Sequence, residues 1–271
     1  MAAPIFLPKN MTRVIFSPTW AASQQAVLEM KGNSMKLENA VVLVTGANRG
    51  LGLEFARQAL AAGARKVYAG ARDPSSVKLP GVVPVRLDVT DPAQVAQAAA
   101  ECGDVTLVVN NAGIAQLGGL LAPGSVDALR AMFDTNVLSI LHMSQAFAPV
   151  LAKNGGGAFL NVLSVVSWAS PAGMGAYSAS KSAAWNLTNG LRGELQAQGT
   201  QVLGLHVGFI DTDLTQGIDA PKLAPALVVE RAYAALAEGQ AEVLIDELAQ
   251  RVKQGLTAAP SFYLAPGPRD A

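Results

Sequence analysis

Residues 41–52 read VVLVTGANRGLG, a run of apolar and mostly β-branched residues followed by three closely spaced glycines. Leu53, Ala56 and Leu60 then recur at helical spacing, so the local order is strand, glycine turn and helix. Glycines permit positive φ and let the backbone approach a ligand, while the N–H groups and dipole of the following helix attract a pyrophosphate. The stretch therefore predicts a dinucleotide-binding loop, with an ordinary tight turn as the alternative.

Outward from this loop, apolar runs typical of strands alternate with alanine-rich stretches typical of helices. This alternation predicts an α/β fold, a single-domain Rossmann-type doubly wound parallel sheet of about seven strands with helices on both faces. We expect strands at Val41–Thr45, Lys66–Ala71, Val82–Leu87, Leu107–Asn110, Ala158–Val165, Gln201–Val207 and Glu242–Ile245. We expect helices at about 51–62, 92–101, 125–152, 175–198 and 228–238.

The composition describes a globular protein without net charge. Of the 271 residues, 51% are hydrophobic and 15% charged, and 20 basic residues balance 20 acidic ones. This balance argues against nucleic acid or an anionic membrane as a partner. Cys102 is the only cysteine, so an internal disulfide is excluded, and without a cluster of His and Cys we expect no metal site. The single cysteine fits a reducing cytoplasm best, and because no apolar run is long enough to cross a bilayer we expect a soluble protein.

Residues 1–34 precede the regular alternation, and we expect them to be an N-terminal extension outside a core domain of residues 35–271. They lack the continuous apolar segment of a secretory signal. Lys9, Arg13 and Lys31 against the single acid Glu29 leave a transit peptide as the alternative. The stretch MKLEN that begins at Met35 resembles the start of a domain.

The stretch MGAYSASKSAAW, residues 174–185, places Tyr177 and Lys181 four residues apart. On a helix this spacing puts both side chains on one face. A phenol has a pKa near 10, and a nearby ammonium group lowers that value, which makes the phenol a usable acid or base. Beside a dinucleotide loop the pattern indicates a catalytic pair. An exposed helical Tyr/Lys pair is the alternative.

The spacing of the glycines, three residues between Gly46 and Gly50 and one before Gly52, resembles the TGxxxGxG cofactor motif of the short-chain dehydrogenase/reductase family. Leu87-Asp88-Val89 is similar to the adenine-contacting segment of that family, and the sequence NNAG at 110–113 matches its motif beside the cofactor ribose. Taken singly, Asp88 is equally a turn residue and Asn110 a cap at the end of a strand. The landmarks occur in the family's order and cover about residues 37–246.

The resemblance implies four catalytic residues: Asn136, Ser164, Tyr177 and Lys181. Ser164, at the end of a strand, would hold the substrate oxygen beside the phenol of Tyr177, which exchanges the proton. Lys181 would lower the pKa of Tyr177 and hold the nicotinamide ribose, and Asn136 would support a water linked to Lys181. The implied reaction is hydride transfer between NADP(H) and a small or medium carbonyl or alcohol substrate.

Position and resemblance together predict a cofactor site formed by Thr45, Gly46, Asn48, Arg49, Gly50, Leu51, Gly52, Ala71, Arg72, Asp88, Val89, Asn110, Ala112, Gly113, Tyr177, Lys181, Gly208, Ile210 and Thr212. Ala71 stands where a fold selective for NAD carries an acid, and Arg72 follows it. Arg49 and Arg72 therefore predict NADP(H), because guanidinium groups bind a 2′-phosphate well. The alternative is that Asp73, two residues after Ala71, acts as the acid that selects NAD.

The segment after the sixth strand departs from the family pattern. The family commonly has a Pro-Gly pair there, whereas this chain has Val207-Gly208. Gly208 and Thr212 keep their spacing, so the resemblance implies that the backbone of Ile210 and the side chain of Thr212 bind the carboxamide. The missing proline leaves the rigidity of this loop open.

A short lid at Asp213–Pro225 is expected over an apolar pocket, in which Trp168, Met174 and Phe209 take part unless they are core residues. His142 and His206 lie in apolar stretches and are expected in the core.

The family resemblance implies a homodimer or homotetramer assembled through the helices at 125–152 and 175–198. Three other interpretations are a non-catalytic dinucleotide-binding sensor, an NAD-dependent alcohol dehydrogenase, and an epimerase or dehydratase of nucleotide sugars. A sensor would be expected to lack part of the Ser/Tyr/Lys set, which is complete here. An epimerase or dehydratase of nucleotide sugars usually needs a larger C-terminal region than the residues after Thr212 provide.

Overall fold

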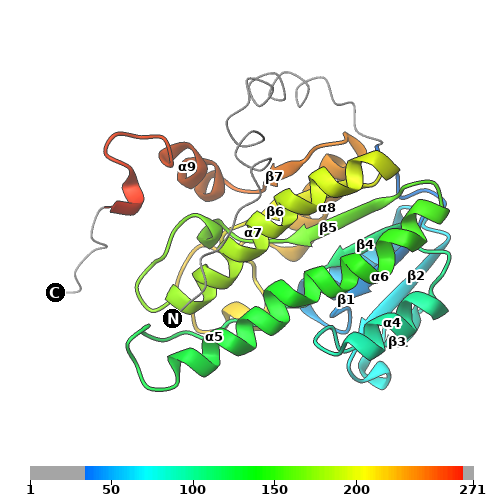
Figure 1. The fold of residues 1–271 in the computed structure, drawn as a ribbon, viewed down its shortest axis with the longest axis horizontal. Coiled ribbons are helices and arrows are strands. Elements are labelled where there is room, and N and C mark those ends of the chain that lie inside the picture. The colour runs from blue at the N-terminus through cyan, green and yellow to red at the C-terminus, as the bar shows by residue number, and fades with distance from the viewer. Residues whose placement is uncertain (1–33, 265–271) are drawn as a thin grey trace, which may run out of the picture. The chain divides into compact units, whose positions relative to one another are not determined.

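The structure, a computed structural model, describes residues 34–264, and its centre is a parallel sheet of seven strands (Figure 1). In sequence order the strands are β1 (Val41–Thr45), β2 (Lys66–Ala71), β3 (Val83–Arg86), β4 (Leu107–Asn110), β5 (Ala158–Val162), β6 (Gln201–His206) and β7 (Glu242–Leu244). Across the sheet the order is β3-β2-β1-β4-β5-β6-β7. The predicted doubly wound α/β fold is confirmed.

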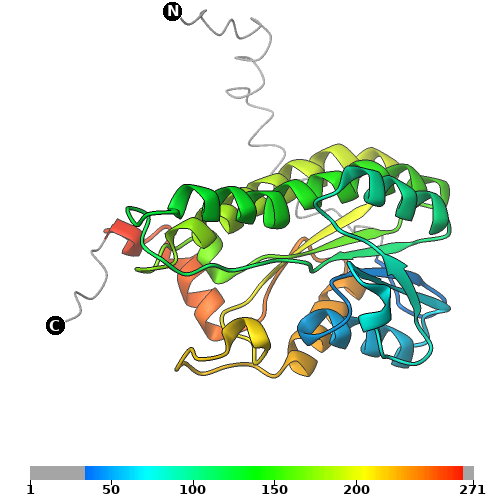
Figure 2. The same cartoon turned by 90° about the horizontal axis from the view of Figure 1, so that it is seen from below.

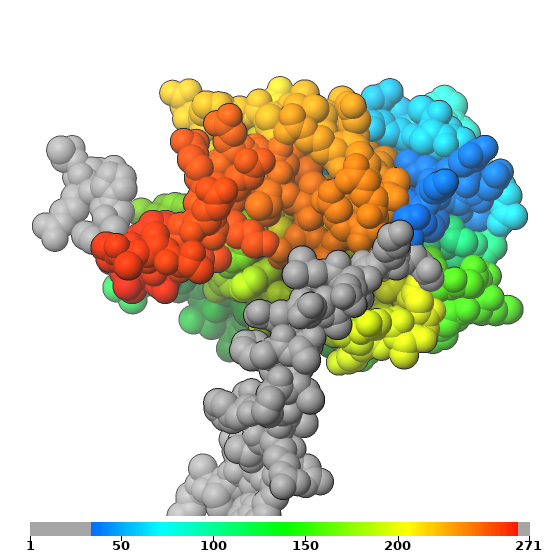
Figure 3. Space-filling model, turned by 90° about the horizontal axis from the view of Figure 1, so that it is seen from above, coloured from blue at the N-terminus to red at the C-terminus, as the bar shows by residue number. Residues whose placement is uncertain are grey.

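Helices cover both faces of this sheet, as Figure 2 shows. One face carries α3 (Gly50–Ala61) and α8 (Pro225–Ala237), and the other carries α4 (Pro92–Glu101), α6 (Ser139–Lys153) and α7 (Gly175–Leu195). Two further helices are α5 (Ser125–Phe133), which leads toward α6, and α9 (Glu247–Gly255) near the end of the described chain. Figure 3 shows the chain after residue 225, orange to red, as a continuous part of one face.

The central strand β1 is buried on both sides, which explains its uninterrupted apolar sequence. Val42 and Val44 pack into the core beneath α3 and α8, whereas Val41 and Leu43 pack beneath α4 and α6. The chain order reverses between β1 and β4, and ligands bind at the carboxyl ends of strands at such a point. The glycine loop after β1 and the NNAG loop after β4 therefore flank the expected crevice.

Several predicted boundaries are wrong, each for a local reason. The strand at 158–165 stops at Val162, because Ser164 caps a 3₁₀ turn at Val165–Ser167 by accepting a hydrogen bond from the N–H of Val166. The helix at 125–152 is interrupted by a π-helical turn at Asp134–Leu138. The helix at 228–238 begins earlier, at Pro225, since proline suits the first helical position.

The remaining differences are small, apart from one missed helix. Strands β3, β6 and β7 are each shorter than predicted, and the helix at 175–198 continues beyond Leu195 only as a 3₁₀ turn. Helix α9 was not expected; Asp246 caps it by accepting the N–H of Ala249 at 2.7 Å. The predicted extension at 1–34 lies outside the described residues, Ser34 excepted.

Gly52 sets the packing of α3 against the glycine loop. A Cβ at this position would lie 2.2 Å from the carbonyl oxygen of Gly46 and 2.5 Å from Nδ2 of Asn111. We expect Gly52→Ala to lower the free energy of unfolding by about 2 kcal/mol or more, because backbone must move to admit the methyl group. Urea denaturation measures the change.

Gly193→Ala is the matched control, since a Cβ on this exposed part of α7 would meet no atom within 4 Å. The free energy of unfolding of this variant is expected to stay the same or to rise by up to about 1 kcal/mol, because alanine has a higher helix propensity than glycine. Equal stability changes in the two variants would contradict the packing assigned to Gly52.

Candidate active site

The four residues predicted as catalytic come from three segments that meet beside the carboxyl ends of β4 and β5. Tyr177 and Lys181 lie on the first turns of α7, Ser164 follows β5, and Asn136 lies in the π-helical turn before α6. The hydroxyl of Ser164 lies close enough to the phenol of Tyr177 to lower its pKa. Lys181 Nζ lies 5.8 Å from the centre of the Tyr177 ring and donates a 2.9 Å hydrogen bond to the carbonyl of Val162. The structure thus brings the serine, the phenol and the ammonium together.

Burial controls the ionisation of both Tyr177 and Lys181. It raises the pKa of Tyr177 to about 12, and the nearby hydroxyl of Ser164 opposes this only in part. It lowers the pKa of Lys181 to about 8. In the cofactor-free protein desolvation dominates the pKa of Tyr177, and Lys181, with a pKa of about 8, is already neutral at the pH where the phenol ionises, so the expected lowering by Lys181 stays a prediction.

Asn136 is almost fully buried and clamps the loop that follows the NNAG motif. Its Oδ1 accepts the N–H of Ile114 at 2.9 Å, and its Nδ2 donates to the carbonyl of Ile114 at 2.9 Å and to Oγ of Ser180 at 3.0 Å. A Cβ on Gly113 would lie 3.2 Å from Asn136 Oδ1 and 3.9 Å from Lys181 Nζ. Asn136 therefore ties the cofactor-side loop to the helix that carries Tyr177 and Lys181.

Thr45 and Asn111 join the two loops of the predicted dinucleotide crevice. Thr45 Oγ1 accepts the N–H groups of Asn111 and Ala112, both at 3.0 Å, and donates to the carbonyl of Val109 at 3.3 Å. Asn111 Nδ2 returns a 2.9 Å bond to the carbonyl of Thr45. Asn111 was missing from the predicted site, although it is the second asparagine of the NNAG motif.

The glycine loop has the form that a pyrophosphate requires. Gly46 and Gly50 adopt φ values of 64° and 53°, in the left-handed region that favours glycine. Arg49 precedes α3 without a side-chain cap, and the first turn of α3 carries no acidic residue. The N–H groups at the start of α3 are therefore not capped by Arg49, and a dinucleotide phosphate fits there.

The residues predicted to select the cofactor lie at the end of β2. Ala71 is buried, and Arg72 is exposed with no side-chain partner among residues 34–264. Asp73 accepts bonds from the N–H and hydroxyl of Ser75, at 3.0 and 2.9 Å, which lower the pKa of its carboxyl. Arg49 forms an exposed 3.2 Å ion pair with Asp213 across the crevice mouth, so its guanidinium is engaged there rather than beside Arg72.

Asp88, Val89 and Asn110 have clear structural roles. Asp88 accepts the N–H and hydroxyl of Thr90, at 3.0 and 2.7 Å, and Val89 packs in the core. Asn110 donates a 2.8 Å bond to Oδ1 of Asn161, which links β4 to β5. These are the turn and strand-end roles that the residues taken singly suggested.

The loop after β6 is held without the family's proline. Gly208 donates its N–H to Oδ2 of Asp246 at 2.8 Å, and Ile210 pairs with Leu223 as an isolated parallel bridge. A Cβ on Gly50 would lie 3.6 Å from Cγ2 of Thr212, so Thr212 lies against the glycine loop. The chain therefore compensates for Val207 with a contact from α9.

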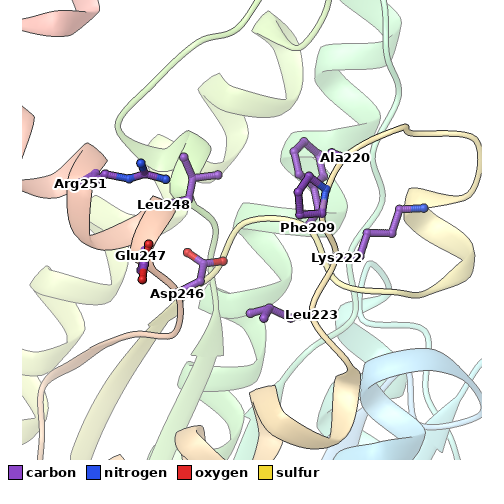
Figure 4. A pocket seen from close by; sticks show the side chains of 9 residues that line it. Phe209, Ala220, Lys222, Leu223, Asp246, Glu247, Leu248 and Arg251 are labelled. Atoms are coloured by element: carbon purple, nitrogen blue, oxygen red, sulfur yellow. The ribbon is translucent and has the colours of Figure 1, made fainter.

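A cavity of about 370 Å³ lies between this loop and α9 (Figure 4). Phe209, Leu223 and Leu248 supply apolar walls, and Lys222 and Arg251 lie at its sides. Phe209 was expected near the substrate and lines this cavity, whereas Trp168 is buried in the core.

The part of the chain that the structure describes has neither a metal-binding cluster nor a membrane-spanning helix. Its side chains form no cluster of three or more His, Cys, Asp or Glu able to hold a metal ion. Within residues 34–264 no helix combines the length and hydropathy needed to cross a membrane.

Comparison with known proteins agrees with this geometry. Residues 40–223 match the family of short chain dehydrogenases. A short chain dehydrogenase of Burkholderia cenocepacia, solved in complex with NADP, is 39% identical, with a TM-score of 0.81 over 86% of this chain and 100% of that one. A Burkholderia phymatum relative solved with NAD is 25% identical, with a TM-score of 0.76 over 86% and 99% of the two chains.

A curated relative widens the range of chemistry among similar proteins. The 1-deoxy-11-beta-hydroxypentalenate dehydrogenase of Streptomyces avermitilis is 33% identical over 70% of this chain and 76% of its own length. The chain belongs to the short-chain dehydrogenase/reductase family and is an oxidoreductase of that family.

The burial of Lys181 predicts a pH-dependent stability. Because the pKa of Lys181 is about 8 in the folded chain and 10.5 when solvated, the unfolded chain binds more protons between these values. The free energy of unfolding of the parent should rise relative to Lys181→Met as the pH increases through this window, by at most about 3 kcal/mol. Urea denaturation at the two ends of the window, without cofactor, measures the difference.

Lys153→Met, at the exposed end of α6, is the control and should show no such trend. A stability difference between parent and Lys181→Met that stays constant with pH would mean that the ammonium group is solvated.

Proposed function

We propose that this protein transfers a hydride between NADP(H) and a small or medium carbonyl or alcohol substrate. The observation that carries the proposal is the meeting of Tyr177, Ser164 and Lys181 beside the two loops of the dinucleotide crevice. The complete set argues against a non-catalytic sensor. When bound, the nicotinamide supplies the hydride to a carbonyl carbon or accepts it from an alcohol.

The chain's own residues supply orientation and the proton. Ser164 holds the substrate oxygen by a hydrogen bond beside the phenol, and Tyr177 donates its hydroxyl proton to that oxygen during reduction. In oxidation Tyr177 takes the proton back. Lys181 lies close enough to stabilise the phenolate that results, and Asn136 holds the adjoining loop through Ile114.

The preference for NADP(H) rests on the end of β2. Ala71 offers no carboxylate to repel a 2′-phosphate, and the exposed guanidinium of Arg72 is available to bind one. Asp73 is turned to Ser75 and caps the following turn, which weakens its case as a displaced acid. The NADP complex of the Burkholderia cenocepacia relative also supports this preference.

The remaining proposals concern substrate, assembly and location. The cavity at Phe209 and Leu223 has apolar walls but is not lined by Ser164, Tyr177 or Lys181, so the substrate is proposed only as a small or medium carbonyl or alcohol. Exposed Val126 on α5 and Leu138 in the following turn support assembly into a homodimer or homotetramer through the helices at 125–153 and 175–195. A reducing cytoplasm suits the single buried thiol of Cys102.

Replacing the phenol tests the proton-transfer role. Tyr177→Phe should lower kcat by about 10²–10⁴-fold, the usual contribution of a positioned acid or base, with the Kd for NADPH changed less than about twofold. Single-turnover kinetics on the best carbonyl of a substrate screen, with cofactor binding followed by NADPH fluorescence, measure both quantities. Tyr263→Phe, at an exposed tyrosine, is the control. A folded Tyr177→Phe protein with parental kcat would remove Tyr177 from the mechanism.

Cofactor selection is tested by the double variant Ala71→Asp/Arg72→Ala. We expect the parent to favour NADPH over NADH in kcat/KM by about 10-fold or more, the worth of a charge-assisted hydrogen bond, and the double variant to lose or reverse this preference. Arg65→Ala, which removes an exposed arginine just before the opposite end of β2, should leave it unchanged. A parent that prefers NADH would support an NAD-dependent alcohol dehydrogenase instead.

A further inference from the structure

His206, the last residue of β6, is completely buried behind Ser164. Its Nδ1 lies 3.2 Å from the carbonyl oxygen of Ser164. Because a carbonyl can only accept a hydrogen bond, this contact is a hydrogen bond in the tautomer that carries the proton on Nδ1. The imidazole also stacks on the indole of Trp168, with ring centres 4.0 Å apart and planes at 19°. His206 is thus fixed from two sides by the segment that begins at Ser164.

Glu242 of β7 fixes the other edge of the imidazole. Its Oε1 lies 3.4 Å from Nε2 of His206 and accepts a 3.0 Å bond from the indole N–H of Trp185, and its Oε2 is paired with Lys253 of α9. Burial raises the pKa of Glu242, but the nearby imidazole of His206 and the hydrogen bonds from Lys253 and Trp185 outweigh it and hold the pKa at about 2. Glu242 is therefore a carboxylate that organises β6, α7 and α9 around one histidine.

The same group of side chains connects the two parts of the proposed active site. Trp185 lies on α7, one turn beyond Lys181, and packs edge-to-face on Trp168 with ring centres 6.0 Å apart. Lys253 Nζ lies 5.5 Å from the centre of the Trp168 ring. The polar contacts of this cluster lead to the backbone of Ser164, whose hydroxyl meets Tyr177 on its other side.

Burying a histidine, a glutamate and part of a lysine costs folding free energy unless these groups pair with one another or with the backbone. An apolar residue at 206 would fill the same space against Trp168. What it would not provide is a donor for the Ser164 carbonyl, which otherwise accepts only the N–H of Ser167 at 3.1 Å. The carbonyl and the hydroxyl of Ser164 are attached through one Cα, so a displacement of this residue's backbone moves the hydroxyl with it.

We propose that His206 is a positioning residue: its Nδ1–H holds the carbonyl of Ser164, and the stack on Trp168 holds the ring, so that the Ser164 hydroxyl stays directed at Tyr177. The inference rests on the proposed hydride-transfer function. It adds a residue that touches neither substrate nor cofactor and acts through the backbone of one that does.

Three substitutions at 206 separate this role from packing. Asparagine places an amide N–H close to the position of Nδ1, glutamine reaches toward Nε2, and leucine keeps bulk without a donor. His206→Leu and His206→Gln should lower kcat about five- to tenfold, the worth of one oriented hydrogen bond, while the Kd for NADPH changes less than about twofold. His206→Asn should keep kcat within about threefold of the parent. His142→Leu, at the only other histidine, controls for loss of an imidazole and should leave kcat unchanged within about twofold.

A double-mutant cycle with Ser164→Ala shows whether the effect passes through the serine. If His206 acts by aiming the hydroxyl, His206→Leu should lower kcat less than about twofold further once that hydroxyl is absent. Full additivity of the two substitutions, or equal losses in His206→Asn and His206→Leu, would overturn the proposal.

Crystal structures of His206→Leu and His206→Asn read the geometry without any turnover. We expect the Ser164 hydroxyl to have left Tyr177 in the leucine variant and to remain in place in the asparagine variant. An unmoved Ser164 in His206→Leu would refute the positioning role even if the protein reduces carbonyls with NADPH. A parent inactive with every carbonyl would instead count against the proposed function, and Ser164 would still report on His206.

Discussion

The side-chain hydroxyl of Thr45 joins the two loops on which the site depends. By accepting the N–H groups of Asn111 and Ala112, it fixes the NNAG segment after β4 against the glycine loop after β1, at the point where strand order reverses. From this junction the chain continues to Ile114, which Asn136 clamps to Ser180 on α7. A single connected set of hydrogen bonds thus sets the distance between the dinucleotide crevice and the helix that carries Tyr177 and Lys181.

Burial then gives this site an ionisation state that suits a resting enzyme. The phenol of Tyr177 has a pKa of about 12 and the ammonium of Lys181 a pKa of about 8, so without cofactor the phenol keeps its proton at neutral pH. Positive charge placed beside Tyr177 favours the phenolate. An oxidised nicotinamide ring would supply such a charge if it were held beside Tyr177 by the two loops of the crevice, and Tyr177 would then ionise more easily.

The sequence was informative where local pattern decides structure. Alternating apolar runs predicted the seven-stranded sheet, and the glycines at 46, 50 and 52 identified the loop after β1. The π-helical turn around Asn136 was missed, because helical periodicity continues through it. Asp246, at the start of α9, is a capping residue that the sequence analysis did not use. Its bond to Gly208 and the stack of Trp168 on His206 could not be predicted in this way, because each joins residues 38 apart in the sequence.

The most direct measurement is an ultraviolet difference titration of tyrosinate in the parent and in Tyr177→Phe, with and without NADP⁺. The four tyrosines of the chain make the single contribution of Tyr177 resolvable as the difference between the two proteins. We expect this tyrosine to ionise only near pH 12 in the cofactor-free protein. Saturating NADP⁺ should move its ionisation toward neutral pH. A Tyr177 that ionises at the same pH in both states would contradict a phenol made catalytic by the bound cofactor.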